Sequence, residues 1–147
     1  MKIILTDSTE LSPIIVTGAK RQIQGASRDV LTFVFSADVG MDALDTAFSE
    51  ANCESISIIE PIETEEIDEN GNPVAKIVEN EYIHKAYTIR TELVKKAVEI
   101  TPATESTEAV TEERITVSMA QRTYAETQLA NLTETVDILV MESLMAE

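Results

Sequence analysis

The sequence predicts an α+β fold: a small, mostly antiparallel β domain with one internal helix, followed by a C-terminal helix that oligomerises. Short β-branched runs separated by turn residues predict the strands. A single stretch after Gly40 has helical spacing, and the chain ends in a run of good helix formers. With 147 residues, the chain has room for one core, or for a small domain with an appended element.

The composition is that of a folded protein. The apolar fraction is 44% but only 4% of the residues are aromatic, so Ile, Val, Leu and Met must fill the core. Cys53 is the only cysteine, which excludes an intramolecular disulfide and suits a reducing cytoplasm, and we expect it to be a small buried residue. We expect no export signal and no membrane partner, because no apolar run reaches the roughly 18 residues that a membrane span needs.

The charge is unevenly distributed. The net charge of −16 makes the average surface repel nucleic acid, so we expect no nucleic-acid partner. Residues 1–36 carry four basic and three acidic side chains, for a net charge of +1, which leaves −17 on the rest of the chain. Lys20, Arg21 and Arg28 form the basic cluster of residues 1–36, which is either a docking contact for an acidic neighbour or a plain solvated loop.

The first strands follow from alternation and turn residues. Ile3–Leu5 and Ile14–Val16 flank a polar turn and predict an opening hairpin. Leu31, Phe33 and Phe35 alternate along the next strand, so we expect these three side chains in the core.

One internal helix is expected at about residues 41–53. Acidic residues in its first turn complement the helix dipole. Its apolar residues recur at the three- and four-residue spacing of a helix face: Met41, Leu44, Ala47, Phe48 and Ala51.

An acidic hairpin and a longer strand follow this helix. Asn70 and Gly71 lie between Ile62–Ile67 and Val74–Val78, which predicts a type I′ hairpin tip. We interpret its acids as a means of solubility or edge protection rather than a catalytic carboxylate pair. These acids are Glu63, Glu65, Glu66 and Asp68. The extended pattern of Tyr82–Val94 predicts a central strand.

Residues 102–114 are rich in Thr and Glu and have almost nothing to bury, which indicates a solvated linker or arm. The sequence therefore predicts a β-rich adaptor domain at residues 1–101, this linker, and a last part at residues 115–147. That part contains a short strand, Ile115–Val117, and the C-terminal helix.

The C-terminal helix is expected to begin near Met119, where Ser118 and Gln121 match a capping box. Its apolar residues begin as a heptad seam, and its last turns are apolar around the whole circumference. Such a helix is buried against copies of itself or a partner, or folds back on the sheet. We predict an oligomerisation surface of Leu129, Leu132, Val136, Leu139, Val140 and Leu144.

No residue pattern indicates catalysis. His84 lies in a predicted strand without a nucleophile motif, and the glycines form no phosphate-binding loop. Residues 68–72 resemble a calcium loop, but Pro73 stands where such a loop needs glycine. We therefore predict that the protein is not an enzyme and has no catalytic residue, no metal site and no cofactor.

The chain resembles small tail-associated proteins encoded by tailed phages and prophages of Gram-positive bacteria. The resemblance lies in Ile3–Asp7, Ile15–Gly18, Asp29–Phe35 and the ending Ile115–Met145, above all in Ala120–Leu129. It implies a structural virion protein of the tail tip or baseplate, made in the host cytoplasm. It also implies other tail proteins as partners and a homo-oligomer, for which a trimer is favoured by analogy.

Two hypotheses therefore stand. The first is a tail component that docks through its N-terminal domain and assembles through its C-terminal helix as a coiled coil. The second is an acidic cytoplasmic protein-binding or assembly-accessory module that turns the acidic hairpin toward a basic partner. The first predicts association that depends on the helix, and the second predicts a monomer whose partner binding weakens with salt.

Overall fold

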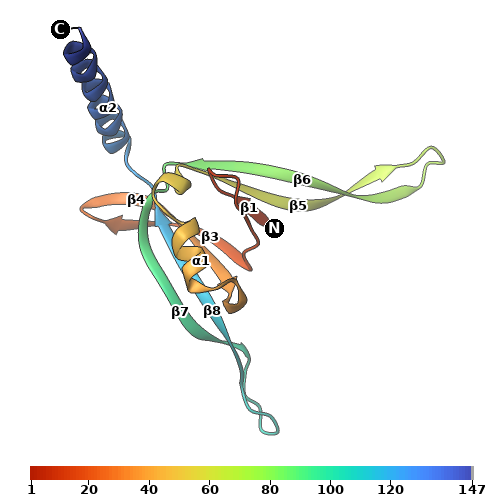
Figure 1. The fold of residues 1–147 in the computed structure, drawn as a ribbon. Helices are drawn as coiled ribbons and strands as arrows, with labels where there is room; N and C mark the ends of the chain where they lie inside the picture. Colours follow the sequence, from red (N-terminus) through yellow and green to blue (C-terminus); the bar gives the residue numbers. More distant parts are fainter. Residues whose placement is uncertain (147) are drawn as a thin grey trace.

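Two four-stranded antiparallel sheets enclose the core in the computed structural model, which describes residues 1–146 (Figure 1). The first sheet has the strand order β2-β1-β5-β6 and the second has the order β3-β4-β8-β7. The predicted α+β class, mostly antiparallel with a C-terminal helix, is confirmed. The strands are β1 (Lys2–Ile4), β2 (Glu10–Leu11), β3 (Ile15–Ile23), β4 (Ala26–Ser36), β5 (Ser55–Ile67), β6 (Pro73–Lys85), β7 (Ile89–Thr101) and β8 (Val110–Ala120). The helices are α1 (Met41–Ala47) and α2 (Tyr124–Met145), with 3-10 turns η1 (Ala37–Val39) and η2 (Ala51–Cys53).

The core lies between the facing sides of the two sheets. Leu31, Phe33 and Phe35 of β4 are buried there, as their alternation predicts. Phe48, just after α1, packs on both phenylalanines, with ring centroids 5.3 Å from Phe33 and 5.8 Å from Phe35. Cys53 is buried in the same cluster, as expected.

The internal helix is shorter than predicted. α1 ends at Ala47, and the second half of the expected span contains the 3-10 turn η2 instead. The buried amide of Asn52 donates to the carbonyl of Ala47 at 2.7 Å, while Asp7 N donates to the Asn52 side chain at 2.8 Å. These bonds favour a compact turn over further helix, because Asn competes with helix by bonding nearby backbone groups.

The predicted opening hairpin is wrong. β1 pairs with β2 across a tight turn in which Ser8 has a φ of 71°, and Asp7 accepts a bond from the Thr9 amide. The run that begins at Ile15 belongs to the other sheet, where it pairs with β4. After this turn β1 pairs with Glu10–Leu11, so Ile14–Val16 is not its partner. The chain passes to the other sheet at Pro13, which is buried.

The expected central strand at Tyr82–Val94 is two edge strands in different sheets, β6 and β7. The break falls at Ala86, whose φ of 65° is left-handed and stops an extended strand. The Ala86 amide donates to the carbonyl of Glu54 at 2.9 Å, and its own carbonyl accepts from the Arg122 amide at 2.8 Å. Both backbone groups of Ala86 are thus satisfied in the turn.

The hairpin of β5 and β6 is confirmed, but its tip is not a two-residue type I′ turn. Residues 68–72 form a longer loop, in which one Asp68 carboxylate oxygen accepts from the amides of Asn70 and Asn72, both at 2.9 Å. The two-residue turn lies instead between β3 and β4, where Gln24 and Gly25 both have positive φ, as type I′ requires.

The interpretation of residues 102–114 as a linker is wrong for residues 110–114. They begin β8, which pairs with β7 along most of its length and with β4 on its other side. Ile115, Val117 and Met119 of β8 are fully buried in the core, so residues 115–120 belong to the same folded body as residues 1–101. Only residues 102–109 lie outside the strands, at the tip of this hairpin.

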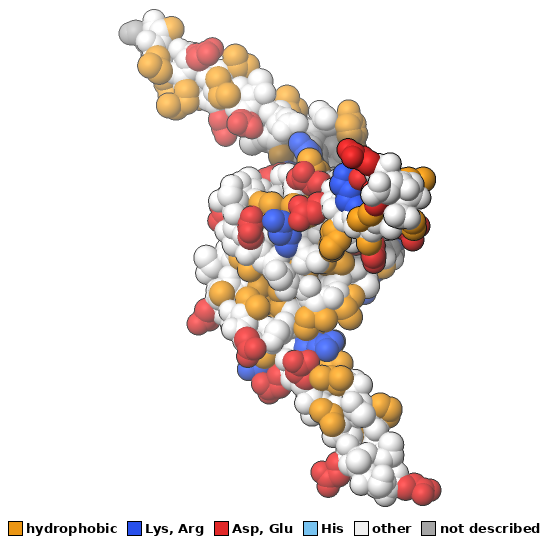
Figure 2. All heavy atoms as spheres, turned by 90° about the vertical axis from the view of Figure 1, so that its right-hand side faces the viewer, with side chains coloured by type: hydrophobic (Ala, Val, Ile, Leu, Met, Phe, Trp, Pro, Cys, Tyr) orange, Lys and Arg blue, Asp and Glu red, His pale blue; other side chains and the backbone are white. Residues whose placement is uncertain are grey.

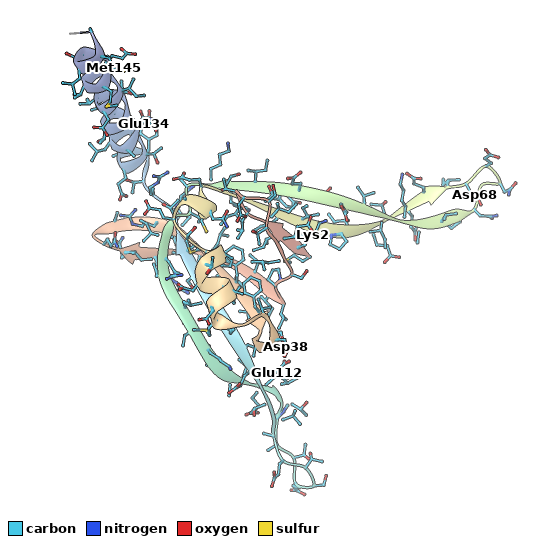
Figure 3. The ribbon with its side chains drawn as sticks, in the orientation of Figure 1. Lys2, Asp38, Asp68, Glu112, Glu134 and Met145 are labelled. Carbon is cyan, nitrogen blue, oxygen red and sulfur yellow. The ribbon has the colours of Figure 1, made fainter. Side chains whose placement is uncertain are left out.

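Three projections leave this body in different directions (Figure 1). They are the far part of the β5–β6 hairpin, the tip of the β7–β8 hairpin, and α2, which stands off the body with the C-terminus at its far end. We call residues 61–79 the β5–β6 arm; all its residues except Asp68 are exposed. Asp68 lies at the far end of this arm (Figure 3).

Candidate assembly surface

α2 is a free-standing helix with an apolar surface. Its 22 residues make it about 33 Å long, and none of them is buried. Figure 2 shows hydrophobic side chains spread over the projecting helix at the top of the view, and Figure 3 shows Glu134 and Met145 on it, far from the sheets. The exposed large apolar residues are Tyr124, Leu129, Leu132, Val136, Ile138, Leu139, Val140, Met141, Leu144 and Met145.

The predicted start of this helix near Met119 is wrong. β8 continues through Ala120 because Met119 and Ala120 are fully buried and pair with β4. The capping box is formed by Thr123 and Glu126 instead: the Glu126 amide donates to Thr123 Oγ1 at 3.2 Å, and the Thr123 amide donates to Glu126 Oε1 at 3.1 Å. The helix therefore begins at Tyr124, after the chain has left the sheet.

Arg28 anchors the first turn of α2 to the second sheet. Its side chain is almost fully buried; Nε donates to the carbonyl of Ile23 at 2.9 Å, and Nη1 donates to that of Gln121 at 3.3 Å. Nη1 also forms a short ion pair with Glu126 Oε1. The guanidinium, together with the Thr123 donors, lowers the pKa of Glu126 to about 2.

Burial removes Arg28 from the predicted docking cluster. Arg28 is 5% exposed, and its Nε and Nη1 donate inside the molecule, so it is not available to an acidic neighbour on another chain. Lys20 and Arg21 are exposed on β3, and neither forms an ion pair with any residue that the structure describes. These two side chains are what remains of the cluster.

A second set of bonds ties the helix base to the first sheet. Arg122 Nη2 donates to both carboxylate oxygens of Glu54, at 2.9 and 2.7 Å. The side-chain amide of Gln121 donates to the carbonyl of Lys85 at 3.0 Å. Because both sheets hold the residues just before α2, the direction in which the helix leaves the body is fixed.

The predicted oligomerisation residues all lie on this helix and are all exposed. Leu129, Leu132, Val136 and Leu139 follow one stripe, while the residues between them are mostly polar. Beyond Asp137 the apolar residues surround the helix. The alternative that the helix folds back on the sheet is contradicted, because no residue of α2 is buried.

A shallow hollow of about 600 Å³ opens where the first half of α2 meets the body. Leu129 and Ala130 supply its apolar wall, and Glu50, Glu134 and Asp137 supply carboxylates. Arg122 also lines the hollow, so its surface combines carboxylates, one cation and an apolar wall.

Outside α2, the residues whose side chains could act in catalysis are packed against other parts of the fold. His84 meets the ring of Tyr87 edge-on, with centroids 5.8 Å apart, and burial raises the pKa of Tyr87. Burial raises the pKa of the Cys53 thiol to about 12, which makes it unreactive. In residues 1–146, no group of three or more His, Cys, Asp or Glu side chains is arranged to hold a metal ion.

The anchor of α2 is the functional feature that sequence reasoning missed. Thr123 and Glu126 match the capping-box signature as well as Ser118 and Gln121 do, so one signal for it was present. The pairing of Arg28 with Glu126 and of Arg122 with Glu54 joins residues 98 and 68 positions apart, and no local pattern indicates it.

Comparisons of the chain with family models, with curated proteins and with solved structures find no match. Neither described helix has the combination of length and apolar character needed to cross a membrane.

Proposed function

We propose that this protein is a structural subunit of a phage or prophage tail tip or baseplate, assembling through α2 and docking on other tail proteins through its β domain. One observation carries the assembly role: an anchored helix presents ten large apolar side chains and buries none of them. The tail location rests on the resemblance of the sequence to tail-associated proteins.

Thermodynamics favours burial of α2 against another chain. In proteins most of the stability of a helix comes from packing of its apolar face rather than from intrinsic helix propensity. Burying one Leu, Ile, Val or Met side chain contributes about 1.5–3 kcal/mol, so a few seam residues from each copy can offset the cost of association. Because bonds to both sheets hold the base of α2, little of the free-energy cost of association comes from reorienting the helix.

The placement of Glu134 and Asp137 on α2 agrees with a bundle of copies. The helix has four acidic residues and no basic one. With Leu129 and Val136 at one core position of the heptad and Leu132 and Leu139 at the other, Glu134 and Asp137 point away from the seam. The copies can therefore meet along the seam without bringing these carboxylates together.

The last turns call for a second partner. In the same heptad frame Ile138, Met141, Leu144 and Met145 lie outside the seam, so a two- or three-stranded bundle leaves them exposed. Exposed apolar groups of this size mark contact surfaces. We infer that another tail protein covers the end of the bundle.

A triple variant of α2 tests the assembly role. Leu129→Gln, Leu132→Gln and Leu139→Gln remove apolar surface from the seam with little change in helix propensity, since Leu and Gln are similar helix formers. In about 0.5 M salt, which screens contacts between exposed charges elsewhere on the surface, we expect the molar mass from light scattering to fall toward that of one chain. The control, Asn131→Gln with Glu134→Gln on the side away from the seam, should leave the mass unchanged. An unchanged mass in the triple variant would reject assembly through α2.

The second candidate is the acidic binding module, which the β5–β6 arm favours. Glu63 and Glu65 are exposed on it without an ion pair among residues 1–146, while Glu66 pairs with Lys76 at 2.9 Å and Asp68 closes the loop. This candidate requires a monomeric protein that binds a basic partner, with affinity falling steeply between low and physiological salt. A mass above that of one chain, together with salt-independent partner binding, would exclude it.

A further inference from the structure

The β5–β6 arm presents an open strand edge with exposed isoleucines. β6 is the last strand of its sheet, so no strand within residues 1–146 pairs with its outer side. Ile67 and Ile77 on the arm are 78% and 72% exposed. A long strand edge with exposed apolar residues is a template for pairing with another chain unless something covers it.

The arm is strongly acidic, and its charge lies mainly on one face. The arm contains six acidic residues and a single basic one, Lys76. Glu63 lies opposite Ile77 and Glu65 opposite Ala75, and strand alternation places all four on the same face as Glu79. A surface that pairs with this edge must therefore tolerate or attract carboxylates.

β3 has the complementary character. It is also an edge strand, and its exposed residues include Lys20 and Arg21, neither of which has an ion-pair partner among residues 1–146. Successive side chains of a strand point to opposite faces, so pairing in either orientation brings one of these cations beside the acidic face of the arm.

The two edges cannot meet within one molecule. In Figure 1 the β3–β4 hairpin and the β5–β6 arm leave the body on opposite sides. The contact must therefore join two copies, as a head-to-tail interface. Such interfaces generate closed rings or open filaments.

We infer that the β5–β6 arm of one copy pairs along β3 of the next copy, with its carboxylates beside Lys20 and Arg21. This goes beyond assembly through α2, since it assigns a second, different interface. It also predicts the form of the assembly: an α2 bundle holds the copies around one axis, so the head-to-tail contacts close into a ring.

Thiol cross-linking on the full-length chain tests the contact. Ala19→Cys on β3 and Ile77→Cys on the arm are both exposed positions, whereas Cys53 is buried and does not react. A short flexible bismaleimide joins them, since the contact need not place the two residues at disulfide distance. We expect the double-cysteine chain to give a ladder of cross-linked multimers that ends at the subunit number of the ring, and each single-cysteine chain to give none.

Charge reversal in the double-cysteine chain tests the chemistry. Glu63→Lys with Glu65→Lys should lower the yield of multimers at least about tenfold, because like charges would then face each other. Adding Lys20→Glu and Arg21→Glu to that chain should restore the yield. The matched control, Glu105→Lys with Glu108→Lys at the tip of the β7–β8 hairpin, makes the same change in net charge and should have no effect.

Three outcomes overturn the inference. These are the absence of a ladder from the double-cysteine chain, equal cross-linking of the single-cysteine chains, or equal effects of the two lysine pairs. Assembly through α2 is measured by molar mass, and the arm contact is measured by cross-linking. If the α2 variants lose mass but the double-cysteine chain gives no ladder, the arm contact alone is rejected. If the double-cysteine chain gives a ladder but the α2 variants keep their mass, the α2 interface alone is rejected.

Discussion

Arg28 and its neighbours show what a residue pattern can and cannot predict. Lys20, Arg21 and Arg28 are equivalent as a list of charges, but β3 and β4 place Arg28 under the base of α2, where it is buried. There Arg28 pairs with Glu126, which is 98 positions away in the sequence, so no local pattern reveals that Arg28 is buried. Core residues are easier, because Phe33 and Phe35 alternate with side chains on the other face.

At this scale we predict the titration of Glu126. Its pKa is lowered from 4.5 to about 2, so the stability it contributes is complete above about pH 4.5 and is lost as the pH falls toward 2. Carboxyl-carbon NMR should show a midpoint near 2 in the intact protein. Arg28→Gln removes the largest cause of the shift and should move the midpoint upward; an unmoved midpoint would show that Arg28 does not hold the carboxylate.

A second prediction at this scale concerns the core. Phe33→Ala leaves a cavity beside Phe35 and Phe48 and should lower the free energy of unfolding by about 3–5 kcal/mol, measured by urea denaturation. The control Val110→Ala, at a position that is 53% exposed, should change it by no more than about 0.5 kcal/mol. Similar losses in both variants would contradict the assignment of the core.

Strands with one buried face can be predicted from the alternation of their residues. Strands whose position depends on pairing with residues far away in the sequence cannot. β4 and the β5–β6 hairpin could be predicted from alternation and turn residues. Of β8, only Ile115–Val117 could be predicted, because the run of Thr and Glu before it is as compatible with an exposed hairpin end as with a linker. The break at Ala86 had no signal, since alanine rarely takes a positive φ.

The cap of α2 gives the prediction at the scale of elements. Thr123→Ala removes the side-chain oxygen that accepts from the Glu126 amide and should cost the helix about 1 kcal/mol. Circular dichroism should show less helix and a lower melting temperature. Thr133→Ala, on an exposed turn of the same helix, replaces Thr with a better helix former and should not lower either value. Equal losses in the two variants would place the start of the helix elsewhere.

For the whole molecule, the arrangement of the sheets was beyond sequence reasoning. β1 pairs with β5 and β4 with β8 across long stretches of chain, so the two sheets interleave in the sequence. The division at residue 102 failed for this reason, because β8 lies between β4 and β7. The C-terminal helix was predicted as an element, and its separation from the body follows from the sheets that hold its base.

The most direct test of assembly through α2 is sedimentation equilibrium of the full chain and of a chain that ends at Arg122. That end retains β8, whose core residues a shorter chain would lose. In about 0.5 M salt, where exposed charges more than a few ångströms apart are screened, contacts of the acidic arm contribute little. We expect the full chain to exceed the mass of one chain and the truncated chain to be a monomer. Equal masses for the two chains would contradict the role assigned to α2.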